Sequence, residues 1–141
     1  MRKRIWTAVL WCLTMLLVTA CADGKIPPHS EAFINQYFPH SSVVLVEMDN
    51  DDDDELEYSV LLNDGTKIEF DLQGHWKRVG RKKTGVPTSL IPPAINQYVR
   101  IHFPEDVVTK LSKKPYGFKI ELSNDMDVRF NPKGQFMEKI D

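Results

Sequence analysis

Cysteine is scarce in this sequence, with only Cys12 and Cys21 among 141 residues. We expect Cys12 to be removed with an N-terminal signal and Cys21 to be acylated, so no disulfide framework can hold the fold together. Stability then has to come from an ordinary hydrophobic core. About 120 residues remain, which is enough for one such core.

Signatures of common catalytic sites are missing as well. The chain has no Gly-x-Ser-x-Gly motif, no phosphate-binding loop and no dinucleotide-binding fingerprint. Its four histidines have no paired metal-ligand spacing; they are His29, His40, His75 and His102. We therefore expect no enzyme activity, no cofactor and no dedicated metal site.

An excess of positive charge is also lacking. The first 20 residues hold three of the 18 basic residues and none of the 20 acidic ones, so residues 21–141 carry a net charge of −5. Nucleic-acid binding needs a basic surface to neutralise phosphates. Nucleic acid is therefore excluded as the expected partner.

The N-terminus has the pattern of an export signal. Three basic residues at positions 2–4 precede fourteen uncharged residues, 5–18, and this order is typical of a signal peptide. The apolar stretch is short for a permanent transmembrane helix, which needs about 20 residues. Thr19 and Ala20 are small and stand directly before Cys21, in a pattern that resembles the bacterial lipobox. We expect cleavage after residue 20 and lipidation of Cys21, which anchors the protein in the bacterial envelope, on the periplasmic or outer-membrane side.

The rest of the chain repeats one pattern twice. Ile26-Pro27-Pro28 recurs as Ile91-Pro92-Pro93, and a Phe-Pro pair follows at residues 38–39 and 103–104. Further pairs then match at an offset of 60: Tyr58 and Phe118, Val60 and Ile120, Leu62 and Leu122, Ile68 and Val128, Phe70 and Phe130, Gly74 and Gly134, Trp76 and Phe136. So many spaced matches predict a tandem repeat. We expect Trp76 and Phe136 to occupy equivalent core positions.

Each half predicts one helix followed by four strands. Proline suits the first turn of a helix, and the residue before a proline avoids the α region, so each helix runs from its Pro-Pro pair to its Phe-Pro pair. Period-two alternation predicts strands near residues 58–62 and 66–72, and further strands are expected near 43–48 and 75–79. The second half repeats this pattern near 106–112, 116–122, 126–131 and 135–140. Asn63-Asp64-Gly65 predicts a hairpin turn.

The predicted fold class is α+β: a tandem repeat of two α-β-β-β-β units, with an antiparallel sheet and the helices packed on one face. A unit of about 50 residues is marginal alone, so we expect the halves to pack together, most simply through one continuous or shared sheet. The predicted divisions are a signal peptide (1–20), a lipidated tether (21–25), a first repeat (26–79), a linker rich in glycine, proline and charge (80–90) and a second repeat (91–141).

These motifs resemble the PepSY-like, beta-lactamase-inhibitor-like envelope proteins of Bacteroides and its relatives. The resemblance rests on Ile-Pro, Phe-Pro, Tyr58-x-Val60-x-Leu62, Asp64-Gly65 and Phe70-Asp71-x-x-Gly74-x-Trp76, with a second copy that ends in Phe130-Asn131-x-x-Gly134-x-Phe136. It covers residues 26–141 and implies a sheet with helices on one side and an open face able to bind a partner. Its motifs are structural, and no inhibitory residue of the family can be matched here.

Two charged clusters are candidate binding sites. The acidic run at residues 49–55 fails as an EF-hand, because Asp54 stands where that loop needs glycine and Val60 where it needs glutamate. The run is read as an expanded, solvated turn, with weak divalent binding as the alternative. The basic cluster at Lys77, Arg78, Arg81, Lys82 and Lys83 is read as a solvated linker, with a contact to the acidic turn or to anionic headgroups as the alternative.

The expected function is that of a non-enzymatic envelope lipoprotein that binds or inhibits another envelope protein, for example a peptidase. The alternative is a periplasmic protein that binds or senses a small ligand. Strand alternation directs Lys67, Glu69, Lys119, Glu121, Asp127 and Arg129 away from the helices, and these are the candidate partner-facing residues. The alternative interpretation is that the same residues form an ordinary solvated face of the sheet, with no partner.

Replacing Cys21 tests the anchoring prediction. Cys21→Ser removes the acceptor thiol, so we expect unprocessed precursor or soluble periplasmic protein in place of a lipidated form. Cell fractionation and fatty-acid labelling give the readout, and Cys12→Ser is the matched control that should be processed normally. A Cys21→Ser protein that still fractionates with membranes and carries label would contradict the prediction.

Overall fold

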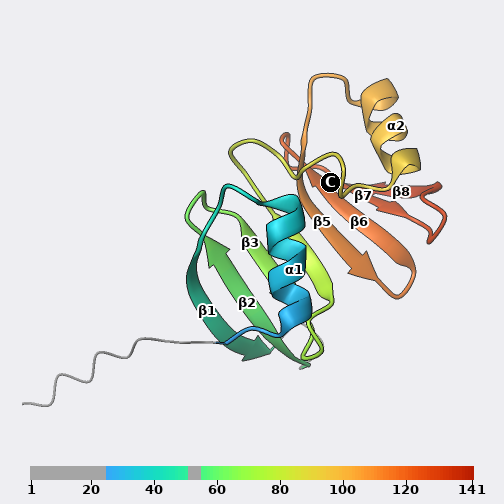
Figure 1. Cartoon of the computed structure of the whole chain (residues 1–141). Coiled ribbons are helices and arrows are strands. Elements are labelled where there is room, and N and C mark those ends of the chain that lie inside the picture. The colour runs from blue at the N-terminus through green and yellow to red at the C-terminus, as the bar shows by residue number, and fades with distance from the viewer. Residues whose placement is uncertain (1–24, 51–54) are drawn as a thin grey trace, which may run out of the picture.

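The computed structural model describes residues 25–50 and 55–141, and within them it contains two helices and eight strands (Figure 1). In chain order these are α1 (Pro28–Tyr37), β1 (Val43–Asn50), β2 (Leu56–Leu62), β3 (Lys67–Phe70), β4 (Trp76–Gly80), α2 (Pro93–His102), β5 (Val108–Lys114), β6 (Gly117–Leu122), β7 (Asp127–Phe130) and β8 (Phe136–Ile140). The α+β class predicted from the sequence is confirmed.

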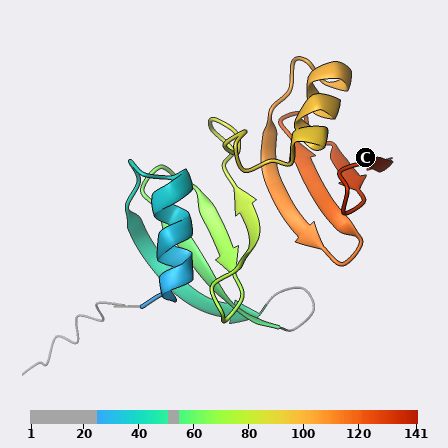
Figure 2. The same cartoon turned by 45° about the vertical axis from the view of Figure 1, so that its right-hand side comes forward.

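All eight strands belong to one antiparallel sheet in the order β1-β2-β3-β4-β5-β6-β7-β8. The two halves of the chain meet where β4 pairs with β5, and there Arg78 lies opposite Ser112 and Val79 opposite Leu111. The strands follow one another along a strongly twisted sheet (Figure 2). The predicted continuous sheet is therefore present, and Gly80, predicted as the first linker residue, is the last residue of β4.

One face of the sheet carries the hydrophobic core. Residues paired across antiparallel strands point to the same face, and the register joins Val60, Ile68, Val79, Leu111, Ile120 and Val128 in one row from β2 to β7. All six side chains are fully buried. This apolar row crosses the joint between the halves without a break, so the two halves share their core.

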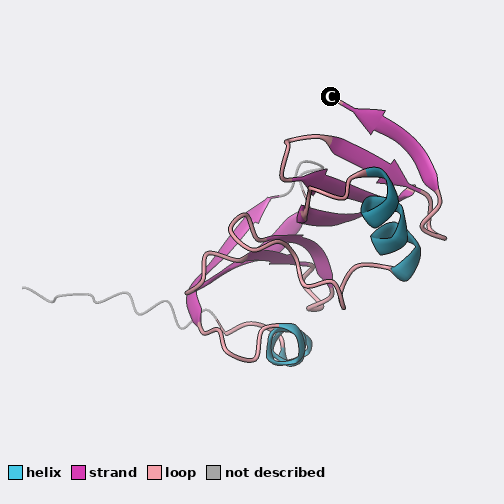
Figure 3. Cartoon of the chain, turned by 90° about the horizontal axis from the view of Figure 1, so that it is seen from above, coloured by secondary structure: helices cyan, strands magenta, loops and turns pink. Residues whose placement is uncertain are grey.

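The helices begin and end where the prolines require. Pro27 and Pro92 are the N-caps, and Phe38 and Phe103 are the C-caps. The two helices lie against different parts of the sheet (Figure 3). Phe33 of α1 meets Phe70 edge-on with ring centroids 5.6 Å apart, and Tyr98 of α2 meets Phe130 edge-on at 5.3 Å.

Glycine is required where the β3–β4 turn approaches α1. Gly74 has φ +90°, and a Cβ there would lie 2.9 Å from both Pro27 Cβ and Ser30 Oγ. Gly134 has φ +77°, and its Cβ would lie 3.0 Å from Ala94 Cβ at the start of α2. A side chain at either position would be strained by its backbone angle and would push the turn away from the helix.

The expectation that Trp76 and Phe136 are equivalent core positions is wrong for Phe136. Both rings stack on a helix aromatic, Trp76 on Phe33 and Phe136 on Tyr98. Trp76 is half-buried, and the Lys113 ammonium of β5 lies 4.0 Å from its ring centre. Phe136 is 44% exposed because β8 is the last strand of the sheet and no neighbour covers it.

Three aromatic truncations test this distribution of the core. Phe70 and Phe130 are fully buried, so Phe70→Ala or Phe130→Ala should lower the free energy of unfolding by about 3–5 kcal/mol. Phe136→Ala should cost roughly 1 kcal/mol, because about half of the ring already contacts water. Denaturant unfolding gives all three values. Equal losses for Phe136 and Phe130 would show that β8 is covered in solution.

Candidate functional site

The face opposite the core is lined by charged side chains. The register that makes the apolar row also joins, one residue along each strand, Glu47, Ser59, Glu69, Arg78, Ser112, Lys119, Arg129 and Glu138 from β1 to β8. We call these residues, with Lys67, Lys110, Glu121 and Asp127 of the next row, the polar face. All six residues selected from the sequence lie on it, since strand alternation fixes their direction.

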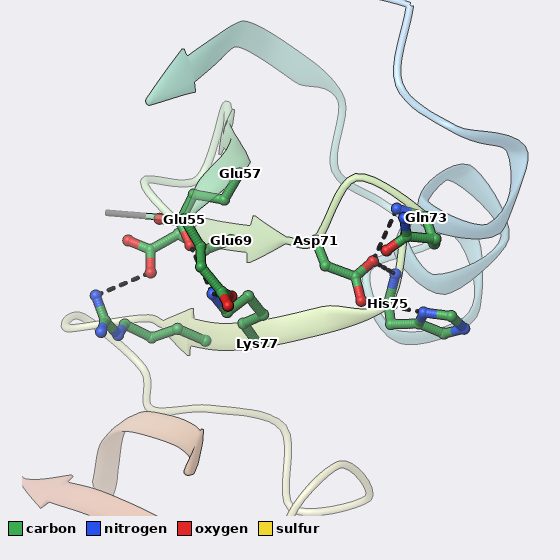
Figure 4. Close-up of polar contacts among 8 residues, drawn as sticks. Glu55, Glu57, Glu69, Asp71, Gln73, His75 and Lys77 are labelled. Atoms are coloured by element: carbon green, nitrogen blue, oxygen red, sulfur yellow. Dashed lines mark hydrogen bonds and ion pairs between the residues drawn. The ribbon is translucent and has the colours of Figure 1, made fainter. Parts of the chain in front are cut away.

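The β2–β4 part of the polar face is built around buried glutamates. Glu69 is only 6% exposed because Arg78 and Lys67 cover it, with nitrogen–oxygen distances of 2.9 and 3.4 Å. Glu57 is also buried, and its carboxylate lies 3.6 Å from the Lys77 ammonium (Figure 4). The buried Glu69 carboxylate therefore neutralises both Lys67 and Arg78. Of these two cations, Lys67 is the one with most of its side chain exposed to solvent.

The β5–β8 part of the polar face carries three cross-strand ion pairs. Lys110 lies 2.7 Å from Glu121, Lys119 lies 2.7 Å from Asp127, and Arg129 lies 2.6 Å from Glu138. Such partly exposed pairs contribute about 0–1 kcal/mol each to stability. Their more definite effect is positional, because each pair holds a long side chain along the sheet and leaves charges of both signs in a fixed pattern.

A polar cluster fastens the joint between the halves of the sheet. Arg81 follows β4, donates its backbone N–H to the Thr109 carbonyl at 2.8 Å and reaches Asp64 in the β2–β3 turn at 2.9 Å. Partial burial raises the pKa of Asp64, but hydrogen bonds from Thr66 and Ser41 and the charge of Arg81 lower it by more, so the net shift is downward. Asp64 is therefore ionised and forms an ion pair with Arg81. Because Arg81 also hydrogen-bonds to Thr109, this ion pair connects the β2–β3 turn of the first half to β5.

The residues weighed as metal ligands do not gather. Within the described ranges, 25–50 and 55–141, no group of three or more His, Cys, Asp or Glu side chains could hold a metal ion. His75 is instead engaged by Asp71, whose carboxylate lies 3.1 Å from the imidazole Nδ1 and accepts the backbone N–H groups of Gln73 and His75 (Figure 4). Most of the acidic run, residues 51–54, lies outside the described residues.

The predicted basic linker cluster divides in two. Lys77 and Arg78 lie in β4 and contact the glutamates of the sheet, and Arg81 contacts Asp64. Lys82 and Lys83 are exposed in the turn that follows. Sequence proximity therefore grouped residues that have separate structural tasks. No helix of the described part of the chain is long and apolar enough to cross a membrane.

Residues 56–138 match the model of a family described as beta-lactamase-inhibitor-like and PepSY-like. The match runs from the start of β2 into β8 and covers more than half of the chain. This chain belongs to the PepSY-like family. The resemblance inferred from the repeated Pro, Phe and Gly positions is thereby confirmed.

Three solved structures of Bacteroides proteins have the same fold as this chain. A periplasmic protein of unknown function from Bacteroides vulgatus is 27% identical, with a TM-score of 0.78 over 84% of this chain and 94% of its own. A periplasmic protein from Bacteroides thetaiotaomicron, whose name proposes regulation by calcium, is 32% identical, with a TM-score of 0.76 over 84% and 92%. A periplasmic DUF2874-family protein from Bacteroides vulgatus is 27% identical, with a TM-score of 0.74 over the same shares.

No functionally curated protein matches the chain. The PepSY-like relatives are described as periplasmic, and none of the three carries a named catalytic activity. These relatives share the fold of this chain and are described as periplasmic, and their descriptions name no protein partner.

Proposed function

We propose that this PepSY-like protein is a non-enzymatic module of the bacterial envelope that binds another envelope protein through its polar face. The observation that carries the proposal is the row of residues that runs across all eight strands with charges of both signs held in place by ion pairs. A face of this kind can match a complementary charge pattern, and such complementarity sets the specificity and rate of association.

The face suits a reversible partner better than a permanent one. Its exposed groups are ionic, whereas the cores of obligate interfaces are strongly apolar. The candidate contacts are Lys67, Lys119, Glu121, Asp127 and Arg129, with Glu69 acting from below by fixing Lys67 and Arg78. We assign this role to the two halves together, as a tandem repeat whose helices both lie on the core face and leave the polar face open.

The proposed location is the periplasmic side of the envelope, with the protein anchored through a lipidated Cys21. Support comes from the basic and apolar N-terminal pattern of residues 2–18 and from relatives that are described as periplasmic. The tether from residue 21 to the first described residue, Lys25, is short, so the anchor holds the sheet close to the membrane.

The alternative, a carrier or sensor of a small ligand, fits less well. Small-ligand sites are usually concave and mostly apolar, and the polar face is lined by Lys, Arg, Glu and Asp side chains. A groove of the described residues lies at the edge of the sheet beside α1, away from the polar face. A protein partner for the polar face is therefore favoured over a small molecule.

Charge reversal tests the polar face. The triple variant Lys67→Glu, Lys119→Glu, Arg129→Glu should remain folded, because the ion pairs that it removes are partly exposed and contribute about 0–1 kcal/mol each. It should recover at least about tenfold less of the partner in crosslinking from the native envelope, since like charges then face the partner. The matched control, Arg100→Glu, Lys133→Glu, Lys139→Glu, makes the same charge change at exposed positions outside the polar face.

Mass spectrometry identifies and quantifies what each form captures. Loss in the polar-face triple variant with retention in the control is the expected result. Equal recovery by the two folded variants would rule the polar face out as the binding surface.

A further inference from the structure

The two halves differ at the first strand of each. Val43 of β1 lies opposite Leu62, and Val108 of β5 lies opposite Leu122; in both strands a one-residue register shift follows immediately. Val43 and Val44 therefore correspond to Val108 and Thr109. Val43 and Val44 are 42% and 61% exposed, whereas Val108 and Thr109 are 5% and 7% exposed. Equivalent positions are covered in one half and bare in the other.

The bare strand borders a groove. Between α1 and β1 lies a cleft of about 710 Å³, lined by Ile26 and Ile34 from the core, by Val43, Val44 and Val46 of the strand, and by Glu31 on the helix rim. Among the described residues β1 pairs only with β2. The outer edge of such a strand presents backbone N–H and C=O groups that can pair with another extended chain.

The second half contains a chain segment that has no counterpart among the described residues of the first half, which begin at Lys25. There β4 pairs with β5, and Val86 donates its backbone N–H to the Val108 carbonyl at 2.7 Å. Val86 and Leu90 are buried in the core. Asn96 of α2 donates its side-chain amide to the Thr88 carbonyl at 2.7 Å and to the Ile91 carbonyl at 3.2 Å. An extended, partly apolar segment thus fills the space beside α2 and β5.

From this difference we infer that β1 and the groove beside α1 form a docking site for an extended segment of a partner protein, which adds a ninth strand antiparallel to β1. The mode is strand addition, in which main-chain hydrogen bonds give affinity and side-chain pockets give specificity. The site lies at the β1 edge of the sheet and includes one polar-face residue, Glu47, and the inference does not depend on the proposed function of that face.

The second half also indicates which side chains the segment should carry. Across the β4–β5 joint, Arg78 lies opposite Ser112 and Val79 opposite Leu111. In β1 the residues that correspond to Ser112 and Leu111 are Glu47 and Val46, because Glu47 pairs with Ser59 and Val46 with Val60. A basic residue followed by an apolar one therefore fits, with the cation beside Glu47 on the polar face and the apolar side chain against Val46.

The helix rim favours the same chemistry. The position that Asn96 occupies in α2, four residues after the N-cap Pro92, is Glu31 in α1, four residues after the N-cap Pro27. A carboxylate can only accept hydrogen bonds, so Glu31 suits backbone N–H groups or a basic side chain of the incoming segment. β1 itself carries acidic and no basic residues, and Lys25, at the start of the described chain, is the one basic residue that lines the groove. The partner segment is thus basic as well as apolar.

A second copy of this chain is a poorer occupant. Its free edge, β8, corresponds to β4, and pairing it with β1 in the β4–β5 register would place Glu138 opposite Glu47 and Lys139 where Val79 is buried. Like charges directly opposite each other are destabilising. Charged residues on an edge strand, lysine above all, are a common protection against strand addition. β8 is therefore protected and β1 is open.

The test uses the segment that the chain itself provides as a template. A labelled synthetic peptide with the sequence of residues 76–91, which carries five positive charges and no negative ones, is titrated into the protein and followed by fluorescence anisotropy. Saturable binding is expected, and it should weaken at least tenfold with a scrambled peptide. Amide chemical-shift changes should centre on residues 43–47 and on Glu31.

Two protein variants test the location. Val44→Lys puts a charge on the exposed edge and Glu31→Lys reverses the rim; each should weaken binding at least tenfold. Ile101→Lys is the matched control, because Ile101 is 64% exposed on α2 and Val44 is 61% exposed; it should change affinity less than twofold. The polar-face triple variant should also bind as the wild type does, which separates this site from the proposed function.

Three results would overturn the inference. They are the absence of saturable binding to the wild type, unchanged affinity in both folded variants, and shift changes confined to the polar face. Sedimentation that shows a dimer abolished by Val44→Lys would also overturn it, because β1 would then be occupied by a second copy.

Discussion

Unbroken antiparallel pairing from β1 to β8 is the constraint on which the rest of this structure depends. Because side chains alternate along every strand and paired residues share a face, one register produces both the fully buried row from Val60 to Val128 and the charged row from Glu47 to Glu138. A slip of one residue in any strand would exchange core and surface in that strand. The register that builds the core therefore also sets which residues form the polar face.

A sheet of this kind always leaves two edges, and this chain treats them differently. β8 carries Glu138 and Lys139 and ends the sheet with charge. β1 has four apolar residues in succession, Val43 to Val46, beside a groove. At the β4–β5 joint, Val86 and Leu90 are buried at the place where the described residues of the first half leave a groove beside β1. We therefore place the inferred docking site at β1, where the first half differs from the second.

Much of this could be predicted from the sequence because the signals are local. The Pro-Pro and Phe-Pro pairs located both helices, alternation located β2 and β3 and the direction of Lys67, and the repeat carried the strand pattern to the second half. Alternation does not distinguish edge from interior, so Phe136 was assigned to the core with Trp76. It also does not reveal that Arg78 covers Glu69, since that depends on a neighbouring strand. The groove did leave a sequence signal: residues 43–46 are uniformly apolar, whereas the equivalent stretch 108–111 contains the polar residues Thr109 and Lys110.

The two halves form one sheet through the pairing of β4 with β5. Amide hydrogen exchange measured by NMR tests this pairing most directly. Hydrogen-bonded amides of residues 78–80 and 110–112 should exchange as slowly as those of β2, β3, β6 and β7, because they lie in the interior of a cooperative sheet. Outward-facing amides of β1 should exchange far faster. Rapid exchange at the β4–β5 joint, with protection confined to each half, would show two separate sheets and would contradict both the continuous polar face and the assignment of β1 as an open edge.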